Sequence, residues 1–305
     1  MTNGSDRLKS FCDWLREGLL VHGGLALPAY RRLGWKGLYL TFCGWPLRSL
    51  IWPVHVPGYG ELRSREQAIN FLGNFCGGEL LNPEVEEHLA CTPKCRVVDV
   101  GVNLGMTAAH WFALQPSARV VGFEMMEEAL SAATAALAVS HPRVDWRPVC
   151  GVVTDAPGEV GLRYDDPRSG LNSVGTQAGR QIRRVWGNTL DAWLAAEGVD
   201  SEPIDLVKID VEGHGAEVLA GAAGSLERTA YLVVEFHSPT ELERCARNLF
   251  RARMDLIAVT GRNAWWRKSG RSAQGQCPAM GMWFSEREKN LFAGHLRRDF
   301  LSSRA

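Results

Sequence analysis

From residue 96 onward, short apolar runs alternate with longer segments that have the composition of helices. Residues 96–100, 119–123 and 144–149 are rich in Val and bounded by polar or turn-forming residues, as buried strands are. The Ala-rich segment 127–138 lies between the last two runs and predicts a helix. This alternation predicts βαβ units and therefore a largely parallel sheet.

The same rhythm resumes after an interruption. Residues 152–186 hold short alternating pieces among Gly, Pro and Asp, at 160–164, 172–174 and 181–185, and predict a β-hairpin insertion. Further strands are expected at 206–210, 231–236, 256–259 and 280–284, further helices at 190–197 and 241–251, and a loop at 261–276. Because no clear helix separates the last two strands, we expect an α/β fold, mostly parallel, with one antiparallel edge strand.

Residues 1–60 lack this rhythm and contain four tryptophans among many Gly, Pro and Arg residues. We therefore divide the chain into an N-terminal cap or lid (1–60) and a main domain (61–305) that carries the insertion. Three interpretations of the first segment stay open: a cap packed on the main domain, a lid over an apolar substrate, or a weak contact with a membrane surface through interfacial aromatics.

Composition narrows the class of protein. The 305 residues are 46% hydrophobic with a formal net charge of zero, which fits one α/β domain with an appendage and argues against nucleic acid as a partner. The eight cysteines are scattered without zinc-site spacing, so we expect reduced thiols and a cytoplasmic protein. No apolar run has the length of a transmembrane segment.

The turn after the first strand carries the first candidate chemistry. It has the spacing Asp99-x-Gly101-x-Asn103-x-Gly105, and the next strand ends in Glu124. A dinucleotide site needs Gly-x-Gly-x-x-Gly to seat a pyrophosphate, whereas an acidic residue here repels phosphate and suits a cationic ligand. S-adenosylmethionine fits, with Glu124 on the ribose hydroxyls; a purely structural glycine turn in an unrelated α/β protein is the alternative.

A second segment, residues 205–221, places Asp210 and Glu212 at the tip of an apolar strand, where open α/β sheets bind ligands. Together with the glycine turn and the run 233–237, it closely resembles the FkbM family of S-adenosylmethionine-dependent methyltransferases, over roughly residues 80–240. The resemblance implies a class I methyltransferase (Rossmann-like) sheet. It also implies an O-methyltransferase acting on hydroxyl groups of sugars, polyketides or other secondary metabolites.

The resemblance also implies roles for single residues. The turn residues Asp99, Gly101, Asn103 and Gly105 match the family's cofactor-binding turn, and Glu124 matches its ribose-binding carboxylate. Met125 stands where the family commonly has proline, beside the cofactor, and Gly215 stands where it often has glutamate. The second departure removes a charge near the predicted site.

Methyl transfer to a hydroxyl needs a group that accepts the hydroxyl proton. The candidates for this group lie at strand tips: Asp210, Glu212, His214, Glu235 and His237. We expect Asp210 to orient cofactor or substrate, and either histidine to serve as base. Asp210 and Glu212 could instead hold a divalent metal such as Mg²⁺, although the chemistry does not require one.

Two other activities remain open from the sequence. An N- or carboxyl-methyltransferase would use the same fold with another acceptor. A nucleotide-dependent oxidoreductase or epimerase would use an NAD-type cofactor, but the third glycine and a Tyr-x-x-x-Lys pair after the fourth strand are missing. The identity of the small-molecule acceptor and the oligomeric state cannot be read from the sequence.

Overall fold

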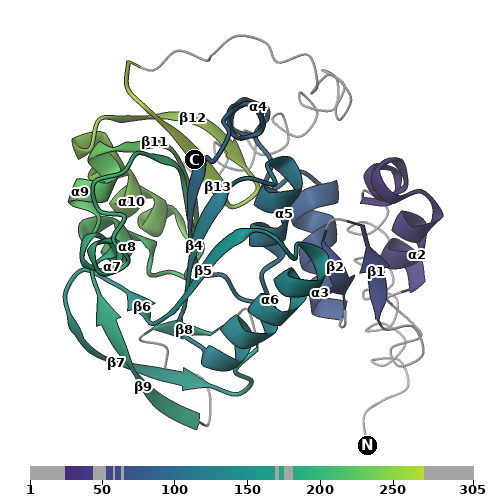
Figure 1. Ribbon diagram of the computed structural model, residues 1–305, viewed down its shortest axis with the longest axis horizontal. Coiled ribbons are helices and arrows are strands. Elements are labelled where there is room, and N and C mark those ends of the chain that lie inside the picture. The colour runs from purple at the N-terminus through teal and green to yellow at the C-terminus, as the bar shows by residue number, and fades with distance from the viewer. Residues whose placement is uncertain are drawn as a thin grey trace, which may run out of the picture. The chain divides into compact units, whose positions relative to one another are not determined.

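The computed structural model describes residues 25–43, 53–57, 59–62, 65–168, 172–174 and 181–270 (Figure 1). They form two compact units. The first holds the described residues up to Pro57 together with Glu61–Leu81, and the second holds the described residues from Asn82 onward with Tyr59 and Gly60. The segment after residue 60 thus groups with the N-terminal unit, whereas the sequence pattern placed it in the main domain.

The first unit is mainly helical. Its elements are a helical segment at residues 25–33, α2 (Trp35–Cys43), β1 (Val54–Val56), β2 (Gly60–Leu62), α3 (Arg65–Phe71) and the π-helix η1 (Leu72–Cys76). Strands β1 and β2 pair as a two-stranded sheet. Gly34 joins the first two helices in a left-handed conformation (φ 61°), which a glycine adopts without strain.

A seven-stranded sheet forms the centre of the second unit, in the order β12-β13-β11-β10-β3-β4-β5. Its strands are β3 (Arg96–Val100), β4 (Arg119–Glu124), β5 (Asp145–Cys150), β10 (Ile204–Ile209), β11 (Thr229–Glu235), β12 (Met254–Thr260) and β13 (Asn263–Lys268). The five strands from β5 to β11 pair in parallel, and β13 runs antiparallel to both of its neighbours. The prediction of a mostly parallel α/β sheet with an antiparallel edge is confirmed. The antiparallel strand is β13, which lies second from that edge, between β11 and the outermost strand β12.

Helices cover both faces of this sheet (Figure 1). They are α4 (Pro83–Cys91), α5 (Met106–Leu114), α6 (Glu127–Ser140), α7 (Leu190–Ala196), α8 (Gly215–Ala220), α9 (Ala223–Glu227) and α10 (Pro239–Arg251). Helices α4 to α6 lie on one side and α7 to α10 on the other, in the layered arrangement that βαβ units produce. The expected cap of α7 is present, since the Thr189 hydroxyl accepts the Ala192 amide at 3.1 Å.

The loop predicted for residues 261–276 is wrong over residues 263–268, which form β13. Trp265 and Trp266 are fully buried in this strand, which pairs with β11 on one side and β12 on the other. Gly261 (φ 58°) makes the tight turn that reverses the chain after β12. Polar residues on both sides hide this short apolar run in the sequence. The strand expected at residues 280–284 lies outside the described residues.

The predicted hairpin insertion is confirmed as a second sheet, in the order β6-β9-β7-β8. Its strands are β6 (Val152–Val153), β7 (Gly158–Tyr164), β8 (Ser173–Val174) and β9 (Gln181–Asn188). Strands β7 and β9 pair antiparallel along their whole lengths, and Leu162 and Tyr164 pack with Met126. Among the described helices, none has both the length and the apolar character that crossing a bilayer would require.

Candidate functional site

The glycine turn between β3 and α5 is built from residues in the left-handed region. Gly101, Asn103 and Gly105 have φ values of 85°, 49° and 79°. A Cβ on Gly101 would lie 1.8 Å from the carbonyl oxygen of Asp210, so no side chain fits between β3 and β10 at this point. The turn therefore brings the backbones of two neighbouring strands unusually close, directly above the sheet's carboxyl edge.

Glu124, the last residue of β4, is fixed against this turn by backbone amides. Its two carboxylate oxygens accept the N–H groups of Asn103 at 2.8 Å and Met126 at 2.9 Å. Burial raises the pKa of Glu124, and these amide hydrogen bonds oppose the rise. Each oxygen has two acceptor positions, so the carboxylate can still accept two hydroxyl donors. Met125, beside it, is half-buried.

A buried lysine links the turn to the next strand. The Lys208 Nζ lies 3.1 Å from Asp99 Oδ1, 3.4 Å from Asp210 Oδ2 and 2.5 Å from the Gly101 carbonyl oxygen. Burial lowers the pKa of Lys208, but the attraction of Asp99 and Asp210 outweighs it and holds the pKa above its usual value. One ammonium group thus ties together both acidic segments that the sequence singled out.

Sequence reasoning missed Lys208. The available signal was a single cation between the apolar residues Val207 and Ile209, two residues before Asp210. A lysine buried on both faces of a parallel sheet needs a charged partner. That partner is Asp99, which lies directly opposite in the register of β3 and β10.

Two polar groups at the turn have acceptor capacity to spare. Asp99 is fully buried, and apart from its ion pair with Lys208 neither carboxylate oxygen accepts a hydrogen bond in the described part of the chain. The Asn103 side-chain oxygen is likewise buried and accepts none there. Buried acceptors of this kind are uncommon in native proteins and mark places where a ligand or water supplies the missing donor.

The tips of β10 and β11 bring Asp210, Glu212 and His237 together. One potential ligand atom from each residue lies within 4.8 Å of the others, so the three could hold a metal ion. The Glu212 carboxylate lies 3.4 Å from His237 Nε2, and an Arg262 guanidinium nitrogen lies 3.4 Å from His237 Nδ1. Burial raises the pKa of Glu212, and His237 opposes the rise.

Glu235, at the end of β11, adds a third carboxyl group to this edge. It hydrogen-bonds to Asp210, and burial together with the negative charge of Asp210 raises the pKa of Glu235 to about 9. Glu235 is therefore protonated near neutral pH, which allows it to donate to Asp210 rather than repel it.

His214 lies apart from this group. Its Nε2 is 3.0 Å from the Thr154 hydroxyl, and its Nδ1 is 3.6 Å from the Glu217 carboxylate. Burial lowers the pKa of His214. The structure thus distinguishes the two histidines: His237 faces Glu212, whereas His214 is engaged beneath the start of α8.

A glutamate from another helix approaches the position of Gly215. A Cβ on Gly215 would lie 3.1 Å from Val234 and 3.6 Å from a carboxylate oxygen of Glu241. The other Glu241 oxygen accepts the His237 backbone N–H at 2.8 Å. A carboxylate from α10 therefore lies near the position where the family often has glutamate.

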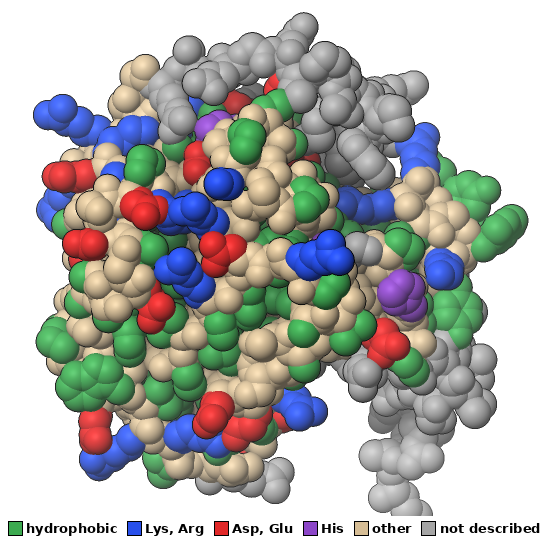
Figure 2. Space-filling model, viewed as in Figure 1, with side chains coloured by type: hydrophobic (Ala, Val, Ile, Leu, Met, Phe, Trp, Pro, Cys, Tyr) green, Lys and Arg blue, Asp and Glu red, His purple; other side chains and the backbone are tan. Residues whose placement is uncertain are grey.

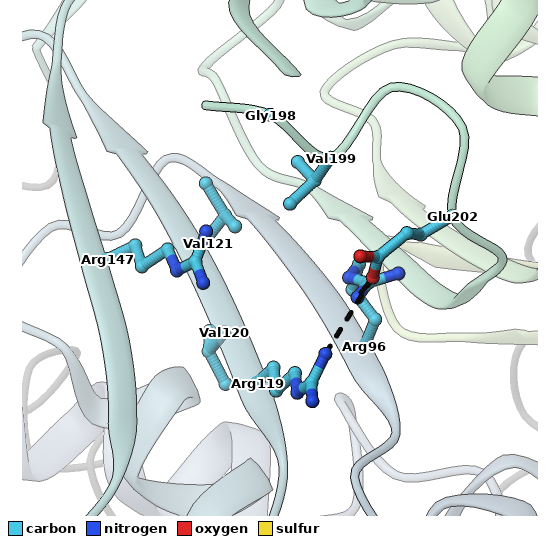
Figure 3. A pocket seen from close by; sticks show the side chains of 8 residues that line it. All are labelled: Arg96, Arg119, Val120, Val121, Arg147, Gly198, Val199 and Glu202. Carbon is cyan, nitrogen blue, oxygen red and sulfur yellow. Dashed lines mark ion pairs between the residues drawn. The ribbon is translucent and has the colours of Figure 1, made fainter. Parts of the chain in front are cut away.

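The opposite, amino edge of the sheet holds a cavity of about 70 Å³ (Figure 3). It is lined by Arg96, Arg119, Val120, Val121, Arg147, Gly198, Val199 and Glu202. Glu202 ion-pairs with Arg96 and also, at 3.8 Å, with Arg119. None of the residues predicted to bind cofactor or to act in catalysis lines this cavity.

Solved structures that match this chain include several methyltransferases. Precorrin-6y C5,15-methyltransferase from Geobacter metallireducens is 13% identical, with a TM-score of 0.36, over 60% of this chain and 82% of that one. Fibrillarin from Aeropyrum pernix, solved with bound S-adenosyl-L-methionine, is 12% identical, with a TM-score of 0.36, over 58% of this chain and 66% of that one.

Curated proteins and a family model match the sequence itself. The 2-O-methyltransferase NoeI of Sinorhizobium fredii is 25% identical over 174 residues, which are 53% of this chain and 70% of NoeI. The hexuronic acid methyltransferase AglP of Haloferax volcanii is 26% identical over 162 residues, 51% of this chain and 62% of AglP, so less than two thirds of that relative is spanned. The model described as "Methyltransferase FkbM domain" matches residues 99–262.

Proposed function

Because this chain belongs to the FkbM methyltransferase family, we propose that it transfers the methyl group of S-adenosylmethionine to a hydroxyl group of a small or medium-sized metabolite. A sugar, polyketide or other secondary metabolite is the proposed acceptor. NoeI is named a 2-O-methyltransferase, which supports a hydroxyl acceptor, and AglP is named a hexuronic acid methyltransferase, which supports a sugar. The observation that carries the proposal is the Glu124 carboxylate, held by two backbone amides beside the glycine turn.

The residues at the turn fit this cofactor. Glu124 retains acceptor positions for two ribose hydroxyls, and the Asn103 side-chain oxygen accepts no hydrogen bond from the described residues. The buried carboxylates of Asp99 and Glu124 would repel a pyrophosphate but tolerate a ligand with a cationic tail. The residues proposed to hold the cofactor are Asp99, Gly101, Asn103, Gly105, Glu124, Met125 and Asp210. When bound, S-adenosylmethionine supplies a methyl group on a positively charged sulfur.

We assign the proton acceptor to His237. The Glu212 carboxylate at 3.4 Å can accept the Nε2 proton, and Nδ1 would take the proton of an acceptor hydroxyl that replaces the exposed Arg262 guanidinium beside it. Glu212 then orients the ring and stabilises the imidazolium that forms. His214 differs because its Nε2 faces the hydroxyl of the buried Thr154, whereas the neighbour of His237 Nδ1 is the exposed Arg262.

The two histidines offer a matched test of this assignment. His237→Gln should lower kcat about 10²- to 10⁴-fold, the usual contribution of a general base. Its affinity for S-adenosylhomocysteine, measured by calorimetry, should change by no more than about twofold because His237 lies outside the proposed cofactor turn. His214→Gln should retain activity close to that of the unaltered protein. The reverse pattern would move the role to His214.

The proposed mechanism needs no metal ion. Asp210, Glu212 and His237 are close enough to hold a divalent cation such as Mg²⁺, which would polarise the acceptor hydroxyl. We nevertheless expect activity to survive exhaustive treatment with EDTA. A loss of activity that Mg²⁺ or Mn²⁺ restores would make Glu212 and His237 metal ligands rather than a base pair.

The cofactor class is tested by titrating the protein with S-adenosylhomocysteine and, separately, with NAD⁺. We expect binding of the first and none of the second; tight NAD⁺ binding without a response to the thioether would favour an oxidoreductase or epimerase. Transfer of a labelled methyl group to a hydroxyl, an amine or a carboxylate then separates O-methylation from the N- and carboxyl-methyl alternatives.

A cytoplasmic location and the lack of a nucleic-acid partner stay predictions from composition.

A further inference from the structure

The helical hairpin of the N-terminal unit, residues 25–43, exposes an unusual number of large apolar side chains. Leu27, Tyr30, Trp35 and Tyr39 have exposed fractions of 55%, 41%, 77% and 37%. Single exposed apolar residues are normal on a protein surface, but a contiguous group of aromatic residues marks an interaction site.

These side chains form one continuous ridge. Leu27 and Tyr30 are one turn apart on the first helix, and Trp35 and Tyr39 are one turn apart on α2. The Tyr30 and Trp35 rings meet edge to face with their centroids 5.6 Å apart across the Gly34 turn, which joins the two pairs. We call this surface the aromatic ridge.

The opposite side of the hairpin is packed. Ala29 on the first helix and Leu40 on α2 are buried. A Cβ on Gly37 would overlap the Ala29 carbonyl oxygen at 1.9 Å, so this glycine allows the two helices to touch. The hairpin therefore has a packed side that contains Ala29 and Leu40, and the aromatic ridge forms its exposed side.

The charged residues of the hairpin itself are all basic. Residues 25–43 contain Arg31, Arg32 and Lys36 but no Asp or Glu, although the whole chain has equal numbers of acidic and basic residues. Arg31 and Lys36 are exposed. Figure 2 shows hydrophobic and basic side chains side by side over α2. A partner for this surface must accept both aromatic rings and positive charge.

We propose that the aromatic ridge and its two exposed cations dock on the surface of a lipid bilayer that contains anionic lipids. Trp and Tyr favour the boundary between headgroups and hydrocarbon, where the ring is buried and its polar atom stays wet. Lys and Arg are attracted by the negative surface potential of anionic lipids. Helices of this length lie on the bilayer rather than cross it.

The test uses the full chain and sedimentation with phosphatidylcholine vesicles, with and without phosphatidylglycerol. We expect binding to the mixed vesicles and much weaker binding to pure phosphatidylcholine. The double variant Trp35→Ser, Tyr39→Ser should lower the partition coefficient on mixed vesicles about tenfold or more. Lys36→Gln should lower it about fivefold, the worth of one basic residue near an anionic surface.

Trp186→Ser is the matched control. Trp186 is also highly exposed, at 54%, but it lies on β9 in the other unit, so its loss should leave vesicle binding unchanged. Circular dichroism should show the same helix content in all variants because the replaced side chains point outward. The same preparations should bind S-adenosylhomocysteine equally, which separates this test from that of the proposed activity.

Equal vesicle binding by the double variant and the unaltered chain would overturn the proposal. The proposal would also be overturned if the unaltered chain bound vesicles equally well with and without phosphatidylglycerol, or did not bind vesicles at all. A concentration-dependent dimer that the double variant loses, without vesicle binding by either protein, would assign the aromatic ridge to a second copy of the chain.

Discussion

The two ends of strands β3 and β4 carry opposite charges, and the two sets of charges are satisfied differently. At the amino ends, Arg96 and Arg119 ion-pair with Glu202, so cation meets anion within the protein (Figure 3). At the carboxyl ends, Glu124 is held by backbone amides and Asp99 shares a single lysine with Asp210. The carboxylate at the amino ends is therefore occupied by arginines, whereas the carboxylates at the carboxyl ends can still accept hydrogen bonds.

This difference indicates which end can recognise a ligand. Side chains that neutralise one another stabilise the edge but offer little to a partner molecule. Carboxylates that are fixed by backbone donors keep unused lone pairs in a defined direction, and the close approach of β3 and β10 at Gly101 fixes the turn beside them. Open α/β sheets bind ligands at their carboxyl edge, and in the described part of the chain Asp99 and Asn103 keep unused acceptors there.

The largest effect should come from removing the lysine at the carboxyl edge. Lys208→Met leaves the Asp99 carboxylate buried without its counter-charge, and breaking such a buried pair costs about 3–5 kcal/mol of unfolding free energy. Urea denaturation measures this loss. The affinity for S-adenosylhomocysteine should fall as well because the Gly101 carbonyl loses the donor that fixes the turn.

A double variant separates the ion pair from simple packing. Asp99→Asn combined with Lys208→Met removes both charges, so it should be clearly more stable than the sum of the two single losses predicts. Strict additivity of the two losses would show that Lys208 and Asp99 do not interact energetically. The Lys208–Asp99 ion pair would then not be what holds the turn in place.

Glu124→Gln should have the next largest effect, on cofactor affinity. The glutamine amide would place its N–H₂ group against one of the two backbone N–H donors, those of Asn103 and Met126. It would also lack the negative charge that strengthens hydrogen bonds from the ribose hydroxyls. We expect affinity for S-adenosylhomocysteine to fall about 10- to 100-fold, the worth of one or two hydrogen bonds to a charged group. Glu127→Gln, in the first turn of α6, is the control and should bind normally. Unchanged binding by Glu124→Gln would reject the ribose assignment.

Glu235 predicts an effect on stability that depends on pH and is small near pH 5. Its folded-state pKa of about 9 lies above the ordinary value of 4.5, so its contribution to stability is complete below about 4.5 and is lost as the pH rises toward 9. Glu235→Gln removes this titration. The variant should therefore gain stability over the unaltered protein progressively between pH 5 and pH 9. A difference that does not change with pH would contradict the raised pKa.

The smallest effect is expected at the amino edge. Glu202→Gln breaks ion pairs to Arg96 and Arg119, but the Glu202 side chain is 42% exposed, so the loss should be about 0–1 kcal/mol. Cofactor affinity should stay within about twofold. A large loss of S-adenosylhomocysteine binding in this variant would mean that the arginine-lined cavity takes part in ligand recognition.

The same contrast explains how much of the site could be predicted from the sequence. Asp99, Gly101 and Glu124 were identifiable because a strand, a turn and the next strand lie close together along the chain, so their spacing reports their geometry. Lys208 was not, since its role depends on the register between β3 and β10, two strands more than a hundred residues apart.

The histidines and the final strand show the same limit. His214 and His237 both follow strand tips, and only packing from Thr154 and Glu212 distinguishes them. Trp265 and Trp266 sit among polar residues in the sequence, and their burial depends on β11 and β12 closing on both sides. Local pattern thus predicts elements and turns, whereas contacts between distant strands decide which side chains act together.

The most direct test of the difference between the two edges is hydrogen exchange of the backbone amides with and without S-adenosylhomocysteine. With the ligand bound, we expect slower amide exchange at residues 101–105 and 124–126, where the turn and Glu124 meet. We expect no change in exchange at residues 96, 119 and 198–202, at the amino edge. Protection at the amino edge, or none at the carboxyl edge despite binding, would contradict this expectation.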